Sequence, residues 1–138
     1  MTHRFIQTED GSTTLYVPEL NEHYHSIHGA IQESVHIFIR AGIEHYRENV
    51  SVSPAPLRIL EAGFGTGLNA YLTLAYATAQ DIPVVYHSLE KYPLTPDEAA
   101  QLNYAECIPY PCPEHFSRLH AAPWETPTAI TPVFSLCK

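Results

Sequence analysis

The stretch LRILEAGFGTGLN, residues 57–69, constrains the fold of this chain more than any other. It begins with a short apolar run that ends in an acidic residue, and three glycines then follow at alternate positions. An amphipathic run over 68–79 comes directly afterwards. This order predicts a buried strand, a glycine loop and a helix, which is the arrangement that α/β folds use to bind nucleotide-like cofactors.

The spacing of the glycines indicates the kind of cofactor. The dinucleotide fingerprint is G-x-G-x-x-G, whereas this chain has G-x-G-x-G at Gly63, Gly65 and Gly67, with Glu61 two residues before the first glycine. A carboxylate at that position repels a pyrophosphate but accepts a hydrogen bond from an ammonium group. The pattern resembles the first motif of S-adenosylmethionine-dependent methyltransferases. A glycine-rich turn without a ligand is the alternative.

A second acidic residue stands at the end of the next predicted strand. Residues 82–90 form an apolar run that ends in Glu90, about 20 residues beyond the glycines. Nucleotide-binding α/β folds place an acid there to hold the ribose hydroxyls. We therefore expect Glu90 to bind a ribose, the alternative being a solvated side chain at a strand end.

Composition narrows the class of protein. The chain has 138 residues, a net charge of −8, a hydrophobic fraction of 45% and a mean hydropathy of −0.14. It has neither a run of 18 apolar residues nor a signal peptide, so we expect a cytoplasmic protein without a membrane partner. The acidic balance argues against a broad basic surface for nucleic acid. Cys107 and Cys112 lack a second cysteine pair, so no metal site is expected.

Other patterns predict the elements around the glycine loop. Strands at 5–8 and 13–17 flank the turn Glu9-Asp10-Gly11-Ser12 and predict a β-hairpin. A polar loop over 18–26 precedes a helix from about 28 to 48, and a linker over 51–56 follows it. The helix has one apolar face, formed by Ile31, Val35, Phe38, Ile39, Ile43 and Tyr46.

The C-terminal part predicts fewer elements than a full cofactor fold contains. Thr95, Pro96 and Glu98 begin a helix that runs to about residue 104, residues 114–121 predict further helical turns, and 131–137 a third strand. We therefore expect an α/β Rossmann-like methyltransferase sheet, incomplete at the C-terminus. Residues 1–52 form an N-terminal hairpin and helix segment and residues 53–138 the first half of the cofactor domain. Uncovered sheet edges would favour self-association.

Four stretches of the sequence resemble one family, the MnmC-type or stand-alone MnmD-type methyltransferase domain. This domain makes 5-methylaminomethyl-(2-thio)uridine at the wobble position of tRNA. The stretches are D-G-S with T-L-Y at 10–16, E-H-Y-H-S with H-G-A and Q-E-S at 22–34, L-E-A-G-F-G-T-G-L-N at 60–69, and S-L-E-K-Y-P-L at 88–94. Together they cover most of the chain.

The resemblance implies a Rossmann-like domain that binds S-adenosylmethionine and methylates the amine of 5-aminomethyluridine in tRNA. The implied cofactor residues are Glu61, Gly63, Phe64, Gly65, Thr66, Gly67, Asn69, Glu90 and Lys91. Tyr24, His25 and Gln32 are expected to border the substrate pocket. An equally good interpretation of His23, His25 and His28 is a hydrogen-bonded loop cluster. A metal site formed by His23 and His25 is a weaker third interpretation.

The resemblance leaves the catalytic residue unassigned. The family's D-A-F-A-P segment, which is thought to supply a catalytic aspartate, does not occur in these 138 residues. A NAD- or FAD-dependent oxidoreductase fragment of Rossmann type and an inactive cofactor-binding module remain the alternatives to a methyltransferase.

Overall fold

The structure is a computed structural model that describes residues 2–50 and 55–138. Most of the linker predicted over 51–56, and the domain boundary predicted between 52 and 53, lie outside the described residues. No helix in the described part is long and apolar enough to cross a membrane. In chain order the elements are β1 (Arg4–Gln7), β2 (Thr13–Val17), β3 (Glu22–His23), α1 (Ala30–Ser34), η1 (Val35–Glu44), α2 (His45–Asn49), β4 (Leu57–Ala62), α3 (Leu68–Gln80), β5 (Val84–Leu89), α4 (Pro96–Ala100), α5 (Tyr104–Cys107), α6 (Glu114–Ala121), β6 (Thr128–Thr131) and β7 (Phe134–Cys137).

The main sheet has the strand order β4-β5-β7-β6. β4, β5 and β7 are parallel, and β6 pairs antiparallel with β7. The predicted mixed α/β fold is therefore confirmed, and the sheet is consistent with a Rossmann-like fold. The strand predicted over 131–137 is present as β7, but it begins only at Phe134, and a further strand, β6, ends at Thr131. Pro132 fixes its φ angle and has no N–H, so it favours a turn between β6 and β7.

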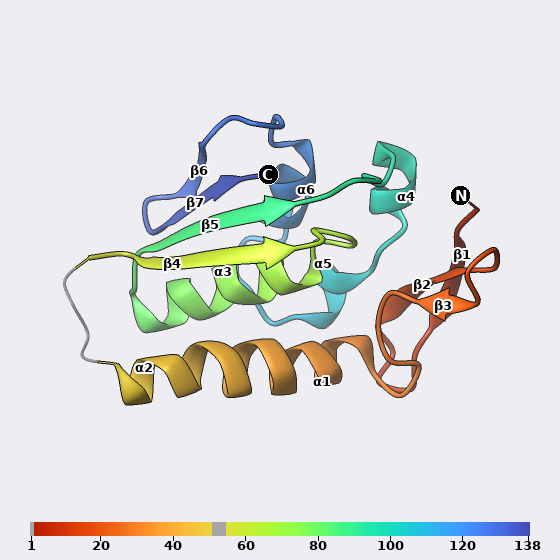
Figure 1. The fold of residues 1–138 in the computed structure, drawn as a ribbon, viewed down its shortest axis with the longest axis horizontal. Coiled ribbons are helices and arrows are strands. Elements are labelled where there is room, and N and C mark those ends of the chain that lie inside the picture. The colour runs from red at the N-terminus through yellow and green to blue at the C-terminus, as the bar shows by residue number, and fades with distance from the viewer. Residues whose placement is uncertain (1, 51–54) are drawn as a thin grey trace.

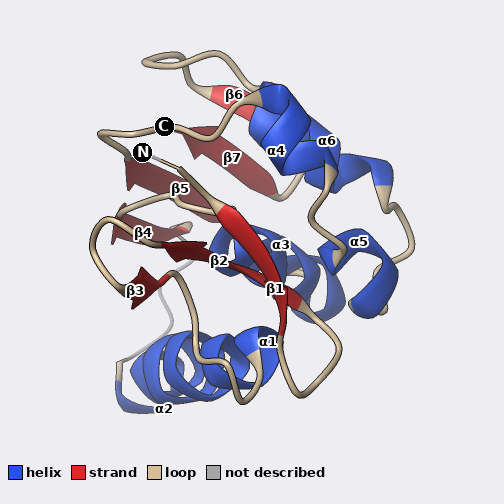
Figure 2. Ribbon diagram, turned by 90° about the vertical axis from the view of Figure 1, so that its right-hand side faces the viewer, coloured by secondary structure: helices blue, strands red, loops and turns tan. Residues whose placement is uncertain are grey.

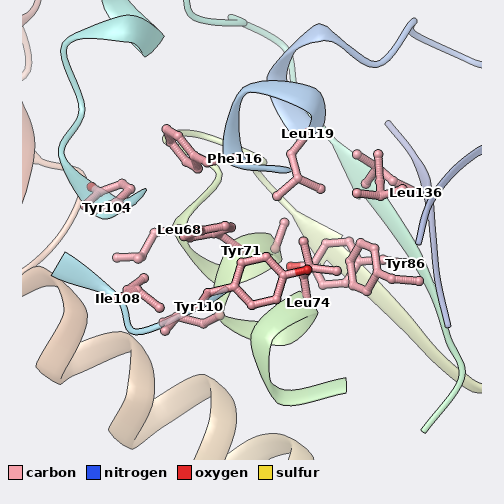
Figure 3. Packing of buried hydrophobic residues seen from close by; sticks show 14 of the residues in the cluster. Leu68, Tyr71, Leu74, Tyr86, Tyr104, Ile108, Tyr110, Phe116, Leu119 and Leu136 are labelled. Carbon is pink, nitrogen blue, oxygen red and sulfur yellow. The ribbon is translucent and has the colours of Figure 1, made fainter. Parts of the chain in front are cut away.

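One face of the main sheet forms the core. Val84 and Tyr86 of β5 are buried on that face, where α3 and α6 supply Tyr71, Phe116 and Leu119 (Figure 3). Side chains of a strand alternate between the two faces of a sheet, so Val84 and Tyr86 point to the same face and pack with the apolar side of α3. This packing fixes the start of α3 beside the ends of β4 and β5.

The long helix predicted over 28–48 is present as a continuous run of α1, η1 and α2 over 30–49. Its middle part is π-helical, and the N–H of His45 donates to the carbonyl of Arg40, five residues earlier. Such wider turns shift later residues out of the 3.6-residue pattern. Tyr46 is consequently 52% exposed, although the sequence placed it on the buried face.

The turn between β1 and β2 caps the start of α1. The N–H groups of residues 30–32 donate to Thr8 Oγ1 at 3.1 Å, Ser12 Oγ at 3.2 Å and Asp10 Oδ2 at 3.0 Å. A Cβ at Gly29 would lie 2.8 Å from Asp10 Oδ2, so this close approach requires glycine. The Asp-Gly-Ser stretch therefore has a structural role, since these N–H groups have no acceptor within the helix.

β1, β2 and β3 form an antiparallel N-terminal sheet in this order, and the segment after α4 holds it against the main domain. The helix predicted to run to about residue 104 ends at Ala100. Asn103 Oδ1 accepts the N–H of Thr13 at 2.9 Å, and Asn103 Nδ2 donates to the carbonyl of Gly11 at 2.9 Å. These long-range bonds explain why the helix ends early. β4 and β5 point toward the N-terminal sheet, which lies near their carboxyl ends (Figures 1 and 2).

Candidate functional site

The glycine loop, residues 63–67, connects β4 to α3 at the carboxyl ends of the parallel strands. The N–H of Gly63 donates to the carbonyl of Leu89 at 2.7 Å. The N–H of Gly65 donates to Glu90 Oε2, also at 2.7 Å. The end of β5 therefore anchors the loop at the edge of the sheet where α/β folds bind their ligands.

Two histidines hold Thr66 from opposite parts of the chain. His25 Nε2 lies 2.9 Å from Thr66 Oγ1, and His120 Nε2 lies 2.9 Å from the Thr66 carbonyl, which accepts its proton. Burial lowers the pKa of His25 and lowers that of His120 to about 4. The ring of Phe64 is buried 5.3 Å from the His120 ring. Phe64 and Thr66 thus hold the loop with their side chains and have only backbone groups to offer a ligand.

Among the three glycines of the loop, Gly63 faces open space. Its φ is +93°, and an added Cβ would meet no atom within 4 Å. A Cβ at Gly65 would lie 3.3 Å from the ring of Tyr24, and one at Gly67 would lie 2.9 Å from His120 Nε2. A ligand can therefore approach the backbone closely at Gly63, while the other two glycines serve packing.

Glu61 is a buried acid at the end of β4, with 6% of its surface exposed. Ser88 Oγ donates to Glu61 Oε1 at 2.7 Å. Burial raises the pKa of Glu61, although the hydrogen bond from Ser88 opposes this effect. Asn69 Oδ1 is buried and has no hydrogen-bond partner within the described part of the chain. A cationic donor would satisfy both groups, since buried polar atoms are normally paired.

Glu90 lies at the end of β5 and already binds the backbone. Its Oε1 accepts the N–H of Tyr92 at 2.9 Å, and its Oε2 accepts the N–H of Gly65. Each carboxylate oxygen has a second lone pair for a hydroxyl donor. Glu90 can therefore hold the loop and a ligand together. Lys91 is exposed beside it, with Nζ 5.2 Å from the centre of the Tyr92 ring.

Two hollows meet at the glycine loop and share Gly63. A cavity of about 230 Å³ lies between the loop, Tyr24, His25 and the start of the long helix. A more open groove of about 500 Å³ is lined by Ala62, Gly63, Leu89, Glu90 and Lys91. Gln32 is exposed and does not line the cavity, where its neighbours Glu33 and Ser34 lie instead.

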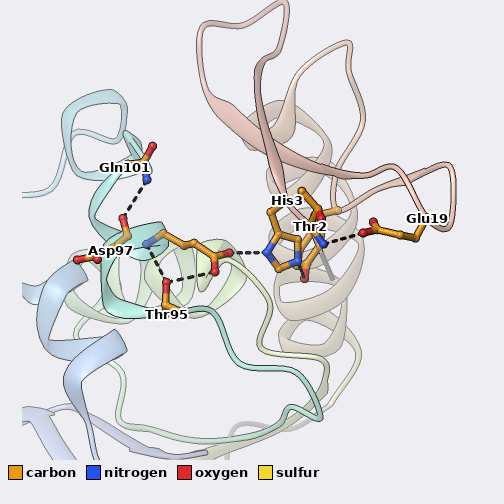
Figure 4. Close-up of polar contacts among 8 residues, drawn as sticks. Thr2, His3, Glu19, Thr95, Asp97 and Gln101 are labelled. Carbon is orange, nitrogen blue, oxygen red and sulfur yellow. Dashed lines mark hydrogen bonds and ion pairs between the residues drawn. The ribbon is translucent and has the colours of Figure 1, made fainter.

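The hydroxyl of Tyr24 begins a hydrogen-bonded chain that the sequence did not reveal. It lies 3.2 Å from His3 Nε2, and His3 Nδ1 pairs with Glu98 (Figure 4). Burial, and then the charges of Glu90 and Glu98, raise the pKa of Tyr24. Glu98 is recognisable in the sequence only as part of the helix start with Thr95, a role that it also has. No local pattern connects it to His3.

The other histidines of this loop lie on the surface. His23 packs against Tyr16 with ring centres 4.7 Å apart, and His28 Nδ1 lies 3.0 Å from a carboxylate oxygen of Glu9. His25 instead binds Thr66. The three histidines therefore do not form one cluster, and His23 and His25 make separate contacts.

Comparison with solved structures finds a protein whose fold is similar to that of this chain. No protein-family model matches the sequence, and no curated protein does. Among solved structures, the crystal structure of MnmC2 from Aquifex aeolicus superimposes with a TM-score of 0.68 at 28% sequence identity. The match covers 99% of this chain and 41% of that one. Over nearly its whole length the chain thus has the structure of an MnmC-like portion, which confirms the family resemblance predicted from its sequence.

Proposed function

We propose that this chain is an S-adenosylmethionine-binding portion of a methyltransferase that acts on the amine of 5-aminomethyl-(2-thio)uridine at the wobble position of tRNA. The main supporting observation is that buried Glu61, open Gly63 and partly buried Glu90 meet at the carboxyl ends of β4 and β5. The MnmC2 likeness supports the choice of tRNA as the substrate.

The residues at this edge fit the chemical groups of the cofactor. Glu61 and the unpaired Asn69 Oδ1 suit the amino acid part, because they offer acceptors to an ammonium group. Gly63 leaves room for a close backbone contact. Glu90 and Lys91 border the groove, in which Glu90 would accept from the ribose hydroxyls. When bound, S-adenosylmethionine supplies a methyl group that its sulfonium already activates.

The contribution of this chain is orientation and control of a proton. The amine must be neutral to attack, so a neighbouring acceptor assists the reaction. Tyr24 borders the cavity, and its hydroxyl connects through His3 to Glu98, which can stabilise a positive charge on the imidazole. The rest of the rate enhancement comes from alignment of the two reactants.

Binding of S-adenosylhomocysteine tests the first part of the proposal by titration calorimetry of the 138-residue chain, with NAD as the competing ligand. We expect S-adenosylhomocysteine to bind and NAD not to bind. Glu90→Ala should weaken the affinity at least about tenfold, because hydrogen bonds to a charged group contribute about 1.5–3 kcal/mol each. Glu48→Ala, an exposed change on α2, is the control.

Several outcomes would contradict the cofactor assignment. Tighter binding of NAD would favour the oxidoreductase alternative. Unchanged affinity in a folded Glu90→Ala variant would refute the ribose role. Glu90→Gln tests the contribution of the charge, since it keeps one acceptor oxygen and replaces the other, which also accepts a backbone N–H, with a donor.

Transfer of labelled methyl groups to tRNA that carries 5-aminomethyluridine tests the reaction itself. Transfer by the 138-residue chain would mean that it contains every group that the reaction needs. Cofactor binding without transfer would support the alternative of a cofactor-binding module.

A further inference from the structure

Three side chains that commonly bind metals converge at the start of α6, away from the glycine loop. One ligand atom each of Cys112, Glu114 and His115 lies within 4.8 Å of the other two. Cys107, the cysteine nearest to Cys112 in the sequence, is exposed and lies outside this group. Cys112 is grouped instead with a carboxylate and an imidazole from the first turn of α6.

The local backbone holds these side chains together. Pro111 and Pro113 flank Cys112, and each has a fixed φ angle. The N–H of His115 donates to the carbonyl of Cys112 at 3.0 Å, which closes the turn into α6. A thiol, a carboxylate and an imidazole therefore project from one restrained turn, so little conformational freedom is lost when they bind a common ion.

Tyr110 orients the imidazole. Its hydroxyl lies 2.7 Å from His115 Nδ1. When Nδ1 donates its proton to the phenol oxygen, Nε2 carries the lone pair that a metal needs. Histidines that bind metals usually have such a partner on the other ring nitrogen.

An independent observation comes from Tyr71 of α3, which is fully buried and packs against Tyr110 with ring centres 5.6 Å apart. Its hydroxyl has no hydrogen-bond partner within the described part of the chain. Tyr71 therefore packs against the residue that binds His115, and among the described residues its buried hydroxyl lacks the polar partner that buried polar groups normally have.

We propose that Cys112, Glu114 and His115 form a binding site for a divalent zinc ion. Thiolate and imidazole ligands suit zinc and exclude calcium and magnesium, which prefer oxygen ligands. Three protein ligands leave one position of a tetrahedral ion for water. The ion would fasten the proline-rich loop to the first turn of α6, and the site does not depend on the function proposed above.

Zinc titration of the metal-free 138-residue chain tests the proposal, together with the absorption spectrum of the cobalt(II) form. We expect one strongly bound zinc ion per chain and a cobalt spectrum with a thiolate charge-transfer band. Cys112→Ser should abolish that band and weaken zinc binding by more than tenfold. His115→Gln should also weaken zinc binding by more than tenfold, and Tyr110→Phe by about tenfold, since loss of a partner outside the ligand shell costs about 10–100-fold.

The chain contains matched controls for this experiment. Cys107→Ser removes an exposed thiol and His87→Gln an exposed imidazole, neither of which belongs to the cluster. Both variants should bind zinc as the parent chain does. The proposal is wrong if the parent chain shows no stoichiometric zinc binding, or if Cys112→Ser retains its affinity. Circular dichroism verifies folding, and zinc should raise the melting temperature of the parent chain but not of folded Cys112→Ser.

Discussion

Gly63 and Gly11 form a matched pair at the scale of single residues. Their φ angles are +93° and +87°, and an added Cβ at either position would meet no atom within 4 Å. Only Gly63 lines the two hollows at the glycine loop. A substitution at Gly11 therefore measures backbone strain alone, whereas the same substitution at Gly63 measures backbone strain together with the loss of space for a ligand.

We predict that Gly63→Ala and Gly11→Ala destabilise the fold by similar amounts, about 1–2 kcal/mol each, because both force a side chain into the left-handed region. Only Gly63→Ala should weaken S-adenosylhomocysteine binding, by about tenfold or more, which corresponds to about 1.4 kcal/mol. Thermal unfolding and titration calorimetry measure the two effects. Equal affinities of the two variants would mean that the ligand does not contact the loop at Gly63.

At the scale of elements, the glycine loop depends on two neutral histidines. His120 donates to the Thr66 carbonyl, and His25 contacts the Thr66 hydroxyl. Burial lowers the pKa of His120, and the positive charge of the neighbouring Lys138 lowers it further. Protonation of either imidazole in the folded state is disfavoured, so the attachment of the loop depends on pH.

We predict that the free energy of unfolding falls as the pH decreases from about 6.5 to about 4. The folded pKa of His120 is about 4 and the ordinary value 6.5, so the unfolded chain binds more protons within this window. The loss amounts to roughly 3 kcal/mol. His120→Gln keeps a donor for Thr66 but does not titrate. Its stability should depend less on pH than that of the parent chain, and identical urea-unfolding profiles from pH 7 to 4 would exclude this role.

The capping of α1 by the β1–β2 turn gives a second prediction at this scale. Asp10→Ala should destabilise the chain by about 1–2 kcal/mol, because helix caps contribute this much and Asp10 accepts the N–H groups of both Ser12 and Gln32. Urea unfolding measures the change. Glu9→Ala is the control, since its exposed contact with His28 contributes at most about 1 kcal/mol. Equal effects of the two changes would contradict the capping role.

Elements with strong local signals were predicted from the sequence, whereas those set by distant contacts were not. The strand, glycine loop and helix over 57–80 follow from periodicity and glycine spacing. The early end of α4 depends on Asn103, which binds the β1–β2 turn. The π-helical part of the long helix and the pairing of β6 with β7 lack a comparable local signal. For the same reason Glu61 and Glu90 could be predicted as residues of the candidate site, but His3 and Glu98 could not.

At the scale of the whole molecule, one face and one edge of the main sheet are uncovered among the described residues. Leu60 of β4 is 72% exposed and Leu89 of β5 is 62% exposed. β4 is an edge strand. An apolar groove of about 260 Å³ lies between β4 and η1, lined in part by Ile37, Tyr46 and Leu60. Apolar edge strands of this kind recruit other chains.

We therefore predict that the 138-residue chain associates with a second copy through β4. Leu60→Lys should shift the equilibrium toward the monomer, because a charged side chain on an edge strand opposes pairing and removes apolar contact area. Leu20→Lys is the matched control, since Leu20 is 57% exposed in the loop between β2 and β3, away from the main sheet. Sedimentation velocity over a range of concentrations measures both variants. A parent chain that stays monomeric throughout, or a Leu20→Lys variant that dissociates as readily as Leu60→Lys, would show that the open edge does not drive association.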